Sequence, residues 1–135
     1  MYHNETERRS KVASNDLSGL LFRAVDLVGG ADQRVDVADA GKGYGILVNK
    51  PLAGEDASVV VDGECEVRVG AAVVAGEWAI SATSGWIVPL TAGSFQVASG
   101  AFFAELTVLG RIVTGAASGM LGVLDVDPFL VVTSG

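Results

Sequence analysis

The side chains that could carry out nucleophilic chemistry are few and lie far apart in the sequence. The one histidine, His3, belongs to a polar N-terminal segment, and a Ser-His-Asp or Cys-His site would require that segment to fold back onto the domain. The one cysteine, Cys65, shares an apolar strand face with Val67 and Val69, which is typical of a small buried core residue, and its chain neighbours are Glu64 and Glu66. The two glutamates are expected to raise the thiol pKa rather than to activate the thiol. The chain therefore lacks the pattern of a nucleophilic enzyme.

Carboxylates and a glycine-rich loop do not form a recognisable site either. Asp125 and Asp127 in "LDVDP" lie on one side of an extended chain, but Ca²⁺ usually takes six or more oxygen ligands and no others follow at loop spacing. Glu77 and Glu105 could form a glycosidase pair, yet nothing in the sequence brings them together. The "GKGYG" loop at 41–45 lacks the phosphate-loop pattern and leads into a strand. We expect no enzyme activity, no cofactor and no metal site.

The overall composition predicts an all-β fold. The 135 residues suit one domain, and half of them are hydrophobic, so a core can form. Ala, Val and Gly dominate, whereas aromatic residues make up only 7%. Small and β-branched side chains fit a pleated sheet, and 18 glycines fit many turns and bulges. We expect a small β-barrel or sandwich of short antiparallel strands with an extended N-terminal arm.

The charge distribution argues against several classes of partner. The net charge is -7, and the acidic residues lie almost entirely after residue 11. An acidic body repels nucleic acid, so direct DNA or RNA binding is not expected. No apolar run approaches the roughly 20 residues that cross a bilayer, and the N-terminus has no apolar signal-peptide region. A single cysteine allows no intrachain disulfide. We expect a soluble protein made in a cytoplasm.

Turn residues divide residues 16–135 into about eight to ten short strands of one domain. The "DGE" sequence at 62–64 predicts a hairpin between two strands. Gly110 interrupts the alternation of "AELTVLGRIV" and predicts a bulge. Asp127 followed by Pro128 predicts the end of a strand.

The aromatic residues are candidates for core or contact positions. Trp78 and Trp86 flank the turn "ATSG", so we expect them near each other on adjacent strands and in the core. The insertion at 93–103 carries phenylalanines that fit either core or interface, and we take Phe102 and Phe103 as candidate contact residues.

Residues 1–15 are interpreted as a polar N-terminal arm ahead of the domain. A lone polar arm usually frays, so a neighbouring subunit or another partner is expected to hold it. Tyr2, Arg8, Arg9 and Lys11 are the candidate anchors, because Tyr and Arg dominate interface hot spots and the arm carries most of its charge in these basic residues. A solvated tail remains the alternative.

The order of several motifs resembles the capsid decoration (cement) proteins of tailed bacteriophages. The pattern begins with "GILVNKP", an Ala/Gly/Glu turn and "VVVDG", continues with "GAAVVAG", and later has "LGRIV" before a turn rich in Ala, Ser and Gly. These motifs lie at Gly45–Pro51, Ala53–Glu55, Val59–Gly63, Gly70–Gly76, Leu109–Val113 and Gly115–Gly119. The resemblance covers about residues 16–124 and leaves out the arm, the 93–103 insertion and the C-terminal tail.

The resemblance implies a small β-barrel-like protein on the outer capsid surface of the virion, made in the host cytoplasm. Such proteins typically form homotrimers at three-fold and quasi-three-fold positions, where they clamp neighbouring capsomers after the shell expands. The implied partners are the major capsid protein and further copies of the chain itself. Three alternatives stay open: another virion β-module such as a tail tube, fibre or adhesin, a small β-barrel enzyme or ligand carrier, and a β domain without an assignable role.

Overall fold

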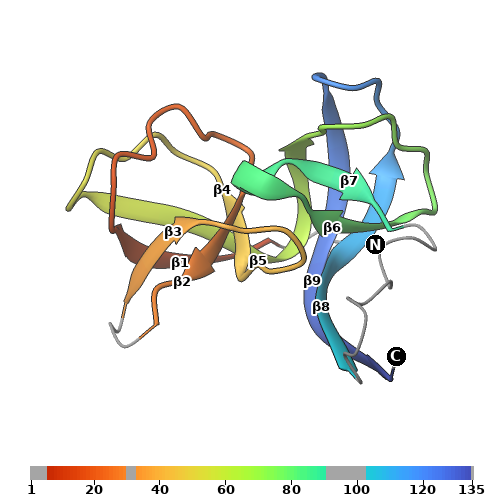
Figure 1. The fold of residues 1–135 in the computed structure, drawn as a ribbon. Helices are drawn as coiled ribbons and strands as arrows, with labels where there is room; N and C mark the ends of the chain where they lie inside the picture. The colour runs from red at the N-terminus through yellow and green to blue at the C-terminus, as the bar shows by residue number, and fades with distance from the viewer. Residues whose placement is uncertain (1–5, 30–32, 91–102, 135) are drawn as a thin grey trace.

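The computed structural model describes residues 6–29, 33–90 and 103–134, and these residues form an all-β fold (Figure 1). Five strands make a closed barrel, drawn on the left of Figure 1. They are β1 (Glu7–Ala13), β2 (Ala24–Leu27), β3 (Arg34–Val37), β4 (Gly45–Leu47) and β5 (Asp56–Arg68). Since β1 pairs with β3 in parallel and with β5 in antiparallel register, the order β1-β3-β2-β4-β5 closes on itself. The prediction of an all-β barrel is confirmed.

The second half of the fold is a sheet that shares β5 with the barrel. Its order is β5-β9-β8-β6-β7, with all neighbours antiparallel. The new strands are β6 (Trp78–Ser81), β7 (Ile87–Pro89), β8 (Phe103–Thr114) and β9 (Leu121–Ser134), and a 3-10 turn, η1 (Thr83–Gly85), joins β6 to β7. At the far edge, Ile87 forms a parallel bridge with Val69, the residue that follows β5. This sheet therefore also curls back toward its first strand.

Strand β5 is continuous, and this corrects the predicted hairpin at 62–64. Asp56 to Asp62 pair with β1, whereas Gly63 to Arg68 pair with β9. Gly63 has φ of 102°, a conformation that glycine adopts without strain, so the chain can pass from one sheet to the other there. Because partner strands are present along the whole segment, continuing the strand satisfies more backbone hydrogen bonds than a turn would.

One hydrophobic core joins the two halves. Inside the closed barrel, Val25, Val35, Leu47 and Val59 are fully buried. A larger cluster fills the second half and extends into the first, because Ala24, Ile46 and Val60 from β2, β4 and β5 pack in it together with Leu109 and Leu124. A third, smaller cluster is formed by Ile80, Leu106 and Val108. The two halves therefore cannot separate without exposing a shared core.

The ladder between β8 and β9 confirms one prediction and corrects another. Its register shifts between Val108 and Gly110, where the bulge was predicted. Strand β9 does not end at Asp127-Pro128, because pairing resumes at Phe129 opposite Val108. The proline lies at the register shift, a position where its missing N–H breaks no regular ladder bond.

The part of the predicted arm that the structure describes is a strand of the barrel. Strand β1 pairs with β5 from Glu7 to Val12, and Ala13 is buried in the barrel core. Its first four residues are exposed, so the strand contributes mainly backbone hydrogen bonds and its sequence reads as polar. Among the described residues no helix is long and apolar enough to cross a membrane.

Candidate interaction surfaces

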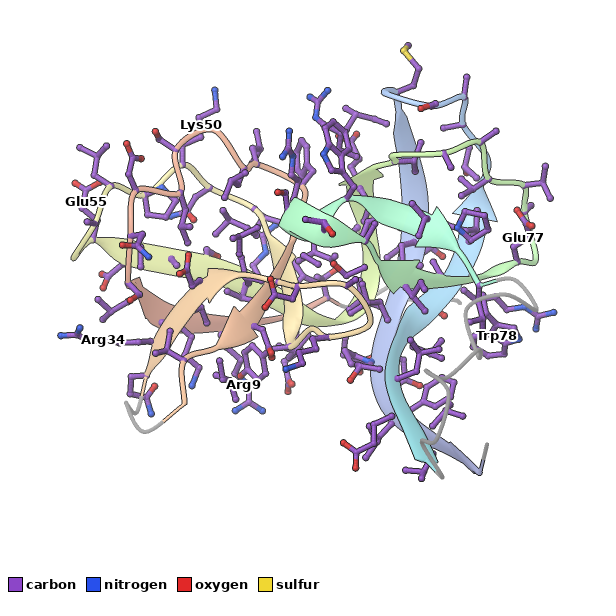
Figure 2. The ribbon with its side chains drawn as sticks, viewed as in Figure 1. Arg9, Arg34, Lys50, Glu55, Glu77 and Trp78 are labelled. Carbon is purple, nitrogen blue, oxygen red and sulfur yellow. The ribbon has the colours of Figure 1, made fainter. Side chains whose placement is uncertain are left out.

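The predicted basic anchors lie on strand β1. Arg9 is labelled in Figure 2, where its side chain points away from the barrel. It forms an ion pair with Glu7 at 3.1 Å, and since both side chains are more than half exposed, this pair adds little stability. Lys11 Nζ donates to Gln33 Oε1 at 3.0 Å and lies 5.5 Å from the centre of the Tyr44 ring. Arg8 alternates with Arg9 along the strand, so the three basic residues are divided between two faces.

Two of the predicted aromatic contacts, Tyr2 and Phe102, lie outside the described residues. Phe103 begins β8, and its backbone pairs with Ser134 of β9. The structure therefore gives the position of only some of the predicted contact residues.

The far end of the β8–β9 pair carries an exposed apolar surface. Strand β6 pairs with β8 only as far as Val108, and β5 pairs with β9 only as far as Val126, so residues 103–107 and 129–134 continue as a two-stranded ribbon. We call this segment the β8–β9 ribbon, and Figure 1 shows it projecting from the body. Leu130 and Val132 on the ribbon are 59% and 53% exposed. Exposed apolar side chains gathered on one part of a surface are a typical site of association.

Trp78 extends this surface and corrects the predicted tryptophan pair. Its ring lies 5.6 Å from that of Phe129 at an interplanar angle of 88°, and the guanidinium of Arg111 lies 5.2 Å from its centre. Trp78 is 43% exposed, so it is not a core residue. Trp86 lies at the opposite end of the β6–β7 hairpin, because Ser81 pairs with Ile87 while Ala79 pairs with Pro89.

Cys65 is a buried thiol without an activating environment. Its Sγ donates to the carbonyl of Glu66 at 3.2 Å. Burial raises the thiol pKa to about 11, with Arg8 opposing and Glu66 reinforcing the rise. The predicted direction is correct, but burial rather than the neighbouring glutamates is the main cause. Within the described residues no group of three or more His, Cys, Asp and Glu side chains could hold a metal ion.

The sequence analysis did not predict the contact between Arg23 and Trp86. The guanidinium carbon of Arg23 lies 3.9 Å from the centre of the Trp86 ring, although the two residues are far apart in the sequence. Such a contact has no local signal, because it depends on how the two halves of the fold meet.

Comparison with known proteins gives a likeness of fold. No family model matches the chain, and no curated protein matches it. Among solved structures, the chain is similar to the N base of the head fiber protein gp8.5 in bacteriophage phi29, with a TM-score of 0.64 and 16% sequence identity. The likeness covers 91% of this chain and 95% of that chain. The family resemblance to decoration proteins thus stays a prediction, while the chain shares the fold of a phage head-fibre base over nearly its whole length.

Proposed function

We propose that this chain is a structural protein of a phage head and acts by binding an assembled surface. The observation that carries the proposal is the fold likeness to the N base of the phi29 head fiber, which extends over almost all of both chains. The motif order that resembles decoration proteins supports the same class of function. Fold alone does not determine function, so the proposal also depends on surfaces fit for contact.

Two forms of this function are proposed. In the first, the protein is a decoration protein that binds the outer capsid surface as a homotrimer and stabilises the shell, as the motif order suggests. In the second, it is the base by which a fibre attaches to the head, as the structural likeness suggests. In both forms the protein binds the major capsid protein.

Binding to the assembled shell would stabilise it by mass action. A protein that binds the shell but not the separated subunits lowers the free energy of the shell by RT ln(1 + [L]/Kd) for each occupied site. Because a head offers many sites, weak contacts at each one add up. The β8–β9 ribbon is the proposed contact surface, since Leu130 and Val132 are exposed there and truncation of an apolar contact residue weakens such interfaces.

The test is co-sedimentation of the purified protein with undecorated capsids of the phage that carries this gene. We expect bound protein in the pellet and a raised melting temperature of the capsid. Leu130→Asp should reduce binding at least ten-fold. Leu52→Asp is the matched control, because Leu52 is 52% exposed and lies in the β4–β5 loop, outside the ribbon. Equal binding by both variants would show that the ribbon is not the contact surface. Absence of wild-type binding would refute the proposed function.

Electron microscopy of the loaded heads separates the two forms. A decoration protein should cover the three-fold and quasi-three-fold positions as compact trimers. A fibre base should carry a projecting density and occupy one defined kind of position. Sedimentation velocity of the free protein gives an independent measure of whether it forms trimers.

A further inference from the structure

A cationic hollow lies where the two halves of the fold meet. It has a volume of about 320 Å³ and is lined mainly by Ser18, Leu21, Arg23, Lys50, Arg68 and Trp86. Figure 2 shows Lys50 on the upper edge of the first barrel with its side chain directed outward. Outside the first eleven residues the chain has only six basic side chains, and three of them gather here. This concentration is unexpected in a protein of net charge -7.

The two guanidinium groups in the hollow have unused hydrogen-bonding capacity. Arg23 Nη1 donates to the carbonyl of Ser84 at 3.5 Å, and Arg68 Nη1 donates to the carbonyl of Gly119 at 3.4 Å, which are both long for such bonds. Arg23 Nε is buried and has no hydrogen-bond partner among the residues that the structure describes. Within the described part of the chain, neither arginine forms an ion pair with a carboxylate. A guanidinium carries five donors, so several stay available to an anion.

The electrostatic environment of Arg23 is also unfavourable without an anion. Burial lowers the pKa of its guanidinium below the ordinary value, and the positive charge of Arg68 lowers it further. Asp16 lies two residues before Ser18 of the lining, and its carboxylate accepts hydrogen bonds from the hydroxyl and the backbone N–H of Ser18. An incoming carboxylate would relieve the repulsion between the two arginines.

The backbone at the two arginines is fixed by contacts between the two halves of the fold. The N–H of Arg68 donates to the carbonyl of Phe22 at 2.9 Å, which ties the end of β5 to the start of β2. Phe22 has a φ of 67°, a conformation that few large residues adopt. A side-chain carbon at Gly85 would lie 3.2 Å from Arg23 Cβ, so the η1 turn is packed closely on this arginine. The backbone that carries the two arginines is therefore preorganised, which lowers the entropic cost of binding.

A second hollow adjoins the first and differs from it in chemistry. It has a volume of about 220 Å³ and is lined by Gly70, Ala82, Trp86, Val88, Ser118 and Gly119. Trp86 borders both hollows, and the other residues that line the second hollow carry no charge. A ligand that fills both therefore needs an anionic group next to an apolar group.

We propose that the two hollows bind a short peptide segment of a partner protein in which a glutamate or aspartate adjoins an apolar residue. The carboxylate would be held by Arg23, Lys50 and Arg68, because arginine pairs well with a planar carboxylate. The apolar side chain would pack against Trp86 in the second hollow. At physiological salt, charges are screened beyond about 8 Å, so the local cations outweigh the acidic body for a short segment. An extended polyanion would run over that acidic body and be repelled. The inference does not depend on which form of head protein the chain is.

The experiment is an NMR titration of the ¹⁵N-labelled full chain with acetylated and amidated dipeptides. We expect Leu-Glu to shift the Trp86 indole N–H and the Arg23 Nε–H signals, with Trp78→Phe used to assign the indole. Leu-Gln, which lacks the charge, and Ala-Glu, which lacks the large apolar group, should each bind at least several-fold more weakly. Lys50→Gln and Arg68→Gln should each weaken Leu-Glu about ten-fold. Lys42→Gln makes the same change in charge at another exposed lysine outside the hollow and should leave the affinity unchanged.

Three results would overturn the proposal. Equal affinity for Leu-Glu and Leu-Gln would mean that charge is not recognised. Equal weakening by Lys42→Gln and Lys50→Gln would mean that only the overall charge matters. Shifts with inorganic phosphate but not with Leu-Glu would mean that the hollow takes a free anion and not a peptide. The measurement needs no capsid, so its outcome is separate from that of the co-sedimentation test.

Discussion

Gly110 is a position in the described part of the chain at which a single methyl group should strongly damage the fold. It has a φ of 151°, and a Cβ placed on it would lie 1.9 Å from the carbonyl oxygen of Asp125 on the neighbouring strand. Real Cβ contacts essentially never fall below 3.0 Å, so β8 and β9 would have to move apart by about 1 Å. Backbone strain of this kind costs about 1–3 kcal/mol, and forcing extra atoms into a packed site costs about the same.

Gly110→Ala should therefore lower the free energy of unfolding by about 2–6 kcal/mol, out of a total of about 5–15 kcal/mol for an ordinary domain. For a chain of this size, 1 kcal/mol corresponds to about 3–5 °C in melting temperature, so a fall of at least 6 °C is expected. Circular dichroism during thermal and urea denaturation measures both quantities.

Two further glycine variants separate the causes. Gly119 has a φ of 85° but open space around it, so Gly119→Ala should cost only the backbone strain, about 1 kcal/mol. Gly19 has neither a positive φ nor a neighbour within 4 Å, and Gly19→Ala should change stability by less than about 1 kcal/mol. If Gly110→Ala and Gly119→Ala melt at the same temperature, the close approach between β8 and β9 is not what requires the glycine.

Three other outcomes follow from buried and hydrogen-bonded groups. The Cys65 thiol has a pKa of about 11, against an ordinary 9.0. Its contribution to the free energy of unfolding is therefore full below about pH 9 and is lost as the pH rises toward 11. Cys65→Ala should remove this pH-dependent loss of stability, as measured by urea denaturation. Hydrogen bonds from Ser18 lower the pKa of Asp16 below 3.8, so stability is lost as the pH falls through the folded-state value, and Ser18→Ala should move the Asp16 NMR titration back toward 3.8. Leu109 is fully buried in the core shared by both halves, so Leu109→Ala should lower the free energy of unfolding by about 2–5 kcal/mol. It should also lower the hydrogen-exchange protection of backbone amides in both halves together. Protection retained in the barrel alone would contradict a shared core.

The sequence predicted the elements whose side chains alternate clearly between two environments. Cys65 and Val67 are buried while Glu66 is exposed, as the alternation indicates. The bulge near Gly110 was also predictable, since a glycine within an alternating segment is a local signal. Strand β1 gave no such signal, because most of its side chains are exposed and its role in the barrel comes from backbone hydrogen bonds.

The remaining errors arise from contacts between distant segments. The hairpin signal at Asp62-Gly63 was overridden because β9, nearly sixty residues later, pairs with the continuing strand. Trp86 looked like a core residue, but the structure places it against Arg23 at the boundary of the two halves. Neither outcome can be read from a local window, because each depends on a partner that only the complete fold supplies.

The continuous strand β5 also determines how the molecule would carry a mechanical load. Its first part is bonded to β1 and β4 and its second part to β9, so a pull on one half reaches the other along a single extended backbone. The interstrand bonds lie across the direction of that pull, and many of them would have to break at once before the strand could slide. A protein anchored through one half and pulled through the other would resist shear without any covalent crosslink.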